Sequence, residues 1–229
     1  MILAIGNPNH RSNTEVVRPV ISATDLVQQP RQMWTIDFGL MPEDEAAQYE
    51  MPFEYARKYV CPVRSRNRRA AYADKWWQYA EARPGMREAL KTVSRYIVTP
   101  RVAKHRVFVW VASEVLSNDG TIVFARADDY FFGVLHSRIH EVWALRMGTS
   151  LEDRPRYTPT TFGTFPFPWP PGREPADAPR VQAIAAAARD LVAKRDAHPH
   201  CALQRAASLA RPGAPSAGSG RARRVRLAG

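Results

Sequence analysis

The stretch Ser94–Trp110, SRYIVTPRVAKHRVFVW, decides how we interpret the rest of the sequence. Two runs rich in β-branched and aromatic residues, Tyr96–Thr99 and Val107–Trp110, have the composition of strands on a half-buried surface. The turn between these runs contains no acid and carries Arg101, Lys104, His105 and Arg106. A rigid pair of strands would therefore hold a cationic turn, and such a turn suits a polyanion.

The net charge of +11 is concentrated in two parts of the sequence. Residues 55–106 hold fourteen Lys and Arg against three acids, and residues 199–229 hold six arginines and no acid. Clustered Lys and Arg release counterions when they meet phosphates, which gives affinity for nucleic acid without sequence information. The alternative is a solvated surface with an ordinary excess of arginine. We take phosphate binding by residues 55–106 as the first hypothesis.

Composition excludes several classes of protein. With 229 residues and 45% hydrophobic residues, the chain is long enough for one large or two small domains with a proper core. Its two cysteines, Cys61 and Cys201, are too few for a disulfide framework and favour a reducing, cytoplasmic location. The longest apolar run falls far short of the ~20 residues of a membrane helix, so we expect no membrane partner.

The order of elements predicts an α+β fold, with a small twisted antiparallel sheet flanked by helices. The pair Asp119-Gly120 indicates a hairpin between Val109–Ala112 and Thr121–Arg126. Asp128 is suited to cap a long helix over Asp129–Met147. Further predictions are a strand at Met33–Gly39, helices starting at Pro42, Pro52, Pro62 and Pro84, an extended aromatic strap at Arg156–Trp169, and a helix at Arg180–Arg195.

The helix predicted to start near Pro62 combines bases with aromatic residues. Its basic residues are Arg64, Arg66, Arg68 and Arg69, of which Arg66 and Arg69 would share one side of a helix and track a phosphate backbone. Its aromatic residues Tyr72, Trp76 and Tyr79 have the spacing of a face packed on a core. Stacking of these rings on bases is the alternative, and it would need exposed rings.

We find no catalytic motif. The sequence has neither a Gly-rich cofactor turn, nor a phosphate-binding loop, nor the Asn/Asp-Pro-Pro-aromatic loop of an adenine methyltransferase. His136 and His140 stand four residues apart, a spacing that zinc can use, but no third ligand is nearby. Ser137 with His140 as nucleophile and base lacks a recognisable oxyanion site. We therefore expect a chain that recognises rather than catalyses, with no cofactor or metal of its own.

Three long strings in the sequence resemble the C-terminal half of the MmeI-like family of large DNA methyltransferases and restriction–modification enzymes. They are SRYIVTPRVAKHR at Ser94–Arg106, YFFGVLHSRIHEVW at Tyr130–Trp143 and RYTPTTFGTFPFPW at Arg156–Trp169. Asn13–Pro19, Trp34–Gly39 and Asn67–Trp77 fit the same family, so the resemblance spans roughly residues 7–196. The run Gly133–Ile139 also resembles a helix of TaqI-like specificity domains.

The resemblance implies a target recognition domain that grips double-stranded DNA while a methyltransferase domain, using S-adenosylmethionine, methylates the N6 of a flipped adenine. We then expect a connector over residues 1–56, the recognition domain over 57–170, a linker and helix over 171–198, and a disordered basic tail over 199–229, which we interpret as a frameshift product. The expected DNA contacts are Arg64, Arg66, Arg68, Arg69, Arg101, Lys104, His105 and Arg106, with Asn118 reading adenine. Three alternatives stay open: an active methyltransferase assembled with a separate chain, a non-functional remnant, and RNA binding.

Overall fold

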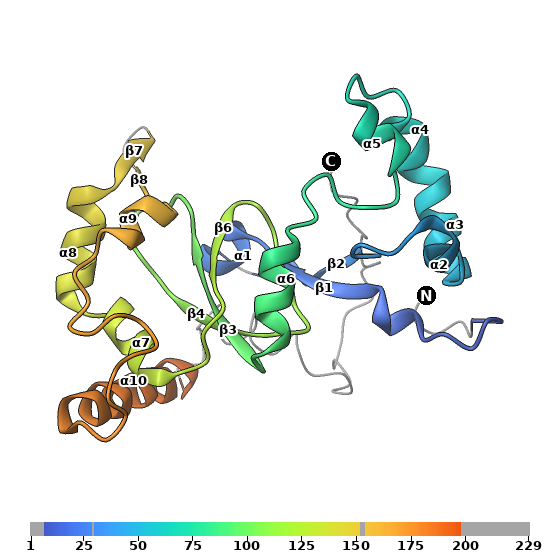
Figure 1. Cartoon of the computed structure of the whole chain (residues 1–229). Helices are drawn as coiled ribbons and strands as arrows, with labels where there is room; N and C mark the ends of the chain where they lie inside the picture. The colour runs from blue at the N-terminus through green and yellow to red at the C-terminus, as the bar shows by residue number, and fades with distance from the viewer. Residues whose placement is uncertain (1–6, 29, 152–153, 198–229) are drawn as a thin grey trace. The chain divides into compact units, whose positions relative to one another are not determined.

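The computed structural model describes residues 7–28, 30–151 and 154–197, which fall into two compact units. Within the described residues, one unit consists of residues 7–20 and 32–88, and the other of residues 21–31 and 89–197. The predicted α+β class is confirmed, because antiparallel strands and helices are largely grouped into separate runs along the chain (Figure 1). The expected tail at 199–229 lies outside the described residues. No helix in the described part of the chain has the length and apolar character needed to cross a bilayer.

The second unit is built on a three-stranded antiparallel sheet with β3 (Arg95–Pro100) in the middle, between β4 (Val109–Ala112) and β6 (Thr121–Phe124). Tyr96 pairs with Val111, and Val98 pairs with both Val109 and Val123. The predicted hairpin between Val109–Ala112 and Thr121–Arg126 is therefore wrong, because both segments pair with β3 and not with each other. Asp119-Gly120 instead closes the short turn from β5 (Leu116–Ser117) to β6.

Side chains of β3 alternate between two covered faces of this sheet. Ile97 faces a core that also contains Trp110, Phe131 and Leu135, so helices α7 (Asp129–Leu135) and α8 (Arg138–Met147) cover that side. Tyr96 and Val98 face the opposite core, which includes Leu26 of α1 (Ala23–Val27). Because both faces are covered, the segment Tyr96–Pro100 is buried along its whole length.

The single helix predicted over Asp129–Met147 is wrong in one respect: it is two helices, α7 and α8, separated at His136-Ser137. Asp128 caps α7 as expected, since its Oδ1 accepts the Phe131 N–H at 2.8 Å. Ser137 then starts α8, its Oγ accepting the His140 N–H at 3.2 Å. A serine hydroxyl in this position satisfies an N–H that would otherwise have no partner, so it favours a new helix start over continuation.

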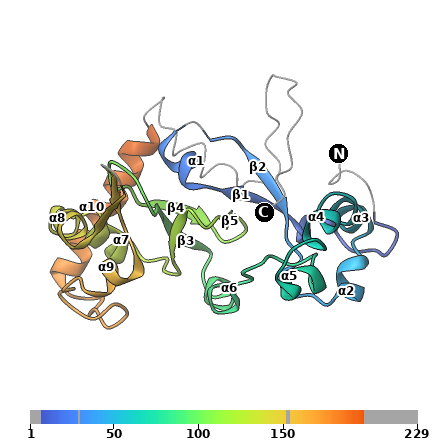
Figure 2. The same ribbon diagram turned by 90° about the horizontal axis from the view of Figure 1, so that it is seen from above.

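Helix α10 (Pro179–Ala197) confirms the predicted C-terminal helix and packs on α7, as Figure 2 also shows. The two helices approach closely at Gly133. A Cβ added there would lie 2.8 Å from Ile184 Cγ2 and 3.0 Å from the Ile184 carbonyl oxygen. Glycine at this position therefore permits the contact between the helices. This contact explains why the helix contains a glycine although glycine weakens an isolated helix.

The strap predicted over Arg156–Trp169 is only partly extended. It contains the short helix α9 (Pro159–Gly163), which Thr158 caps, since its Oγ1 accepts the Thr161 N–H at 3.2 Å. As expected, rings of the strap pack on the core, with Phe162 and Phe167 against Phe131. Preceding the strap, β7 (Thr149–Leu151) pairs with β8 (Arg154–Arg156).

The first unit has its own hydrophobic core, which packs against a pair of strands. Strands β1 (Val17–Ile21) and β2 (Met33–Ile36) pair antiparallel, after a 3-10 turn at Asn13–Glu15. Helices α2 (Glu43–Ala47) and α3 (Glu50–Tyr59) place Tyr49 and Phe53 against Phe38 and Trp76. The predicted proline-led helices at Pro42 and Pro52 are thus present in the structure, and helix α6 (Pro84–Lys91) matches the helix predicted from Pro84.

One predicted helix of this unit is not formed as expected. The segment after Pro62 consists of α4 (Cys61–Arg64) and α5 (Ala70–Asp74), with a turn between them. Arg66 and Arg68 lie in that turn, and Arg69 stands at the N-cap position of α5 without a capping side-chain hydrogen bond. The expected helical spacing of Arg66 and Arg69 therefore does not apply. The expected boundary between residues 56 and 57 falls inside α3. The two compact units described above instead divide the chain within β1, after Arg31 and within α6.

Candidate nucleic-acid interface

The loop that follows β3 lies against β8. Val102 forms a bridge with Arg156, the Tyr157 N–H donates to the Arg101 carbonyl at 2.7 Å, and the Ala103 N–H donates to the Pro155 carbonyl at 3.4 Å. Residues two apart on a strand point to the same side, so Arg154 and Arg156 share a face. Both are exposed, as are Lys104 and His105 on the neighbouring loop.

We refer to Arg101, Lys104, His105, Arg154 and Arg156 as the basic edge. Among the described residues, none of these five forms an ion pair within 4.0 Å. Glu152 and Asp153, which stand between β7 and β8 in the sequence, lie outside the described residues. Exposed basic side chains without an acidic partner can neutralise phosphates and release the counterions of the DNA. The basic edge therefore has the chemistry of a phosphate-contacting surface.

Arg106, a candidate from the sequence, has a different role from its neighbours. It is largely buried and donates to Thr99 Oγ1 at 3.1 Å, to the Pro155 carbonyl at 3.3 Å and to the Pro100 carbonyl. Its guanidinium also lies 4.9 Å from the centre of the Tyr157 ring. Burial without a carboxylate partner lowers the pKa of Arg106 to about 10. Arg106 thus holds the loop onto β8, and its hydrogen bonds are used within the protein.

The two histidines considered as metal ligands are also occupied in the core. The Nδ1 of His140 is 2.8 Å from the Leu135 carbonyl, which can only accept, so Nδ1 donates and Nε2 accepts from Tyr157 Oη at 2.9 Å. His136 Nε2 lies 3.0 Å from the Phe108 carbonyl. Burial lowers the pKa of both rings, that of His140 to about 4. In the described part of the chain, no three ligating side chains gather where a metal ion could sit.

The turn at Asn118–Gly120 and the start of α1 lie near the loop after β3. The Arg101 N–H donates to the Gly120 carbonyl at 2.8 Å, and the Asn118 N–H donates to the Ile21 carbonyl at 3.0 Å. A Cβ on Gly120 would lie 3.3 Å from the Ala23 Cβ. Within one unit, the start of α1 is therefore a neighbour of this turn, the turn is a neighbour of the loop after β3, and that loop is a neighbour of β8.

Asn118 is exposed, but half of its amide is already engaged. Its Oδ1 accepts the Gly120 N–H at 3.1 Å, which closes the turn. A bidentate contact with adenine needs the carbonyl to accept and the amide nitrogen to donate at the same time. In this conformation Oδ1 is held by the turn and keeps one lone pair for a second donor, so a bidentate base contact by Asn118 would share Oδ1 with the turn.

In the first unit, the four candidate arginines also divide into two kinds. Arg64 is half-buried, with its guanidinium directed at the carbonyls of Trp76 and Gln78, and burial lowers its pKa. Arg69 is exposed but donates to Tyr72 Oη at 3.0 Å. Arg66 and Arg68 are exposed in the turn before α5. The structure therefore leaves Arg66 and Arg68 as the members of this group most available to a phosphate.

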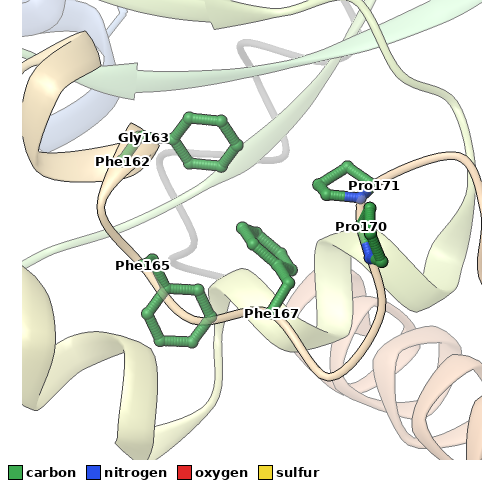
Figure 3. A pocket seen from close by; sticks show the side chains of 6 residues that line it. All are labelled: Phe162, Gly163, Phe165, Phe167, Pro170 and Pro171. Atoms are coloured by element: carbon green, nitrogen blue, oxygen red, sulfur yellow. The ribbon is translucent and has the colours of Figure 1, made fainter.

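An apolar hollow of about 290 Å³ lies in the strap, lined by Phe162, Gly163, Phe165, Phe167, Pro170 and Pro171. Figure 3 shows the rings of Phe162 and Phe167 on one side and the two prolines on the other. None of these side chains offers a charge or a hydrogen-bonding group, so the hollow does not contribute to phosphate contact.

The sequence reasoning missed Arg154 and Arg156. Residues 107–198 have nearly balanced charge, and this balance concealed a local Arg-Pro-Arg at 154–156. An arginine on each side of a proline is the signal that could have identified a short edge strand with one basic face.

A family model described as MmeI, target recognition domain, matches residues 5–169. The solved structure of the Type IIL restriction–modification enzyme MmeI in complex with DNA is similar with a TM-score of 0.62 and 20% sequence identity. The similarity covers 86% of this chain and 25% of that enzyme, so the chain spans about a quarter of its length. No curated protein matches the sequence.

Proposed function

Because the chain belongs to the family of MmeI target recognition domains, we propose that it binds double-stranded DNA and reads its sequence. The observation that carries the proposal is the basic edge, where Lys104, Arg154 and Arg156 lie exposed on neighbouring segments held together by backbone hydrogen bonds. Phosphate contacts from such a surface fix register on a duplex, while nearby polar side chains read the bases.

Within this proposal the residues have different tasks. Lys104, His105, Arg154, Arg156 and Arg101 contact phosphates from the second unit, and Arg66 and Arg68 do so from the first. Arg64, Arg69 and Arg106 support these segments through hydrogen bonds within the protein. Asn118 presents its Nδ2 group beside the basic edge.

We further propose that the chain serves as the recognition part of an N6-adenine DNA methyltransferase of restriction–modification type. The methyl donor, S-adenosylmethionine, would then be bound by a methyltransferase part other than this chain's described units. An assembly with a separate methyltransferase chain is one form of this arrangement. Co-purification of adenine methylation activity with the chain would support it, and a non-functional remnant would show no such activity.

Selection of preferred sequences from a randomised duplex library tests the proposed function. The purified chain should retain duplexes that share a short common sequence, and duplex RNA should compete poorly with DNA. Recovery of an unbiased pool would contradict sequence reading. Equal competition by RNA would favour the alternative of RNA binding. Cooperative thermal unfolding of the same sample is the control, because it shows that the protein used is folded.

A further inference from the structure

A buried carboxylate holds one exposed arginine in a fixed orientation in the unit that carries the basic edge. Asp25 is buried, and its Oδ1 accepts the Arg31 N–H at 3.0 Å and the Arg31 Nε–H at 3.2 Å. Ser22 Oγ accepts from Arg31 Nη2 at 2.8 Å and donates its own hydrogen to Asp25 Oδ2 at 2.6 Å. The Arg31 side chain remains 39% exposed while that of Asp25 is 3% exposed.

These contacts use only one side of the guanidinium. Arginine has five N–H donors, and the contacts to Asp25 and Ser22 engage Nε and one hydrogen of Nη2. The described residues provide no further partner for the edge formed by Nη1 and the second hydrogen of Nη2. That edge matches the paired acceptors O6 and N7 of guanine in the major groove. Since its orientation is already fixed, little side-chain freedom is lost on contact.

Another arginine–aspartate pair in the chain shows the contrast. Arg87 directs Nη1 and Nη2 at the two oxygens of Asp37, each at 2.8 Å, and its side chain is only 19% exposed. The edge that would read a base is therefore consumed by the carboxylate. Arg31 differs because Asp25 engages its Nε side and leaves the outer edge accessible. The Arg87–Asp37 pair thus anchors a segment within the protein. The Arg31–Asp25 pair instead leaves the outer edge of its guanidinium accessible to a ligand.

The position of Arg31 agrees with a role in recognition. Ser22 and Ala23 begin α1, and Ala23 lies against Gly120, which is hydrogen bonded to Arg101 of the basic edge. The residue that follows, Gln32, has φ of +52°, a left-handed conformation that costs free energy for a side chain other than glycine. Backbone strain of this kind is concentrated at functional sites.

We propose that Arg31 is a specificity-determining residue that reads a guanine in the major groove, with Asp25 and Ser22 as its positioning residues. The proposal rests on the proposed function, since it names one base contact of the DNA-reading surface. The Arg31 proposal goes beyond the proposed function, because it names both the residue that reads the DNA and the base that this residue contacts.

The test compares sequence selection by the wild-type chain and by Arg31→Lys. Lysine keeps the positive charge but has neither the rigid planar fork nor the Nε–H that Asp25 holds in place. The preference for guanine at one position should therefore fall about tenfold to a hundredfold. Affinity for duplexes that lack the preferred sequence should be unchanged. Ser22→Ala, which removes one anchor and leaves the arginine, should reduce the same preference by a smaller factor. Arg180→Ala on α10 is the matched control and should leave the selected sequence unchanged.

The outcomes separate this inference from the proposed function. If wild type selects a sequence and Arg31→Lys selects the same one with equal stringency, the role of Arg31 is wrong while sequence reading stands. If the preference lost is for a base other than guanine, the assignment of the base is wrong. If wild type binds no duplex, the proposed function fails and this inference fails with it. Thermal unfolding of each variant shows whether a change in selection reflects loss of folding.

Discussion

At the scale of single residues, Arg106 and Arg154 show that two arginines on adjoining segments have different environments. Arg106 donates to three protein oxygens from a largely buried position, whereas Arg154 is exposed and forms no ion pair among the described residues. We expect Arg106→Met to lower the free energy of unfolding by about 1–3 kcal/mol, because buried acceptors lose their donor. Arg154→Ala should change it by less than about 0.5 kcal/mol.

Denaturant titration of both variants measures this difference, and duplex affinity gives the complementary result. Arg154→Ala should weaken DNA binding without a change in stability. Equal stability for wild type and Arg106→Met would show that the loop does not depend on this side chain.

His140 makes the stability of the second unit depend on pH. Burial lowers the pKa of His140 to about 4, below its ordinary value of about 6.5, so the unfolded chain binds this proton first as the pH falls. The contribution of His140 is therefore fully present above pH ~6.5 and is lost as the pH falls toward 4. Its size is at most about 3 kcal/mol.

Free energies of unfolding measured between pH 4.5 and 7.5 test this dependence. The wild-type value should decline toward the acid end, and His140→Gln, whose amide can replace both hydrogen bonds, should decline less steeply. Parallel curves for the two proteins would rule out His140 as a source of the slope.

At the scale of elements, the contact between α7 and α10 depends on a glycine. Gly133→Ala should destabilise the protein by about 1–3 kcal/mol, because its Cβ would meet Ile184 and Ala188 within 3.2 Å. Gly85→Ala in α6 is the matched control: nothing lies within 4 Å of an added Cβ, so alanine should stabilise the helix by up to about 1 kcal/mol. Thermal unfolding should shift in opposite directions for the two variants, and equal shifts would refute the close helix contact.

Elements were predictable from the sequence where one local signal controls the outcome. The run Tyr96–Thr99 and the cap at Asp128 were identified correctly because side-chain shape and a capping carboxylate act within a few residues. The pairing of β4 and β6 with β3 was missed, because strand order depends on contacts distant in the sequence. The break at Ser137 was missed because the apolar spacing continues across it.

The candidate site was predictable in the same limited sense. Lys104 and His105 were identified from the charge of their turn and are exposed as that role requires. Arg64 and Arg106 could not be distinguished from them, since an arginine bound to backbone carbonyls has no signature in the sequence. Arg154 and Arg156 were missed because only the fold brings β8 beside the loop after β3.

At the scale of the whole molecule, the basic residues proposed to contact DNA occur in both units, on the basic edge and in the turn with Arg66 and Arg68. Each phosphate neutralised by such a side chain contributes about 0.9 to the slope of log affinity against log salt. The number of basic side chains in contact with phosphates can therefore be counted from the salt dependence of binding. Variants in each unit give the count for that unit, without knowledge of the preferred sequence.

The salt dependence of duplex binding tests the central claim most directly. The affinity of the wild-type chain for a labelled duplex should fall with rising salt, and the variant Lys104→Ala/Arg154→Ala/Arg156→Ala should bind more weakly, with a slope reduced by about 2 to 3. Arg180→Ala should keep the wild-type slope. An unchanged slope in the triple variant, with its folding intact, would show that DNA does not contact the basic edge.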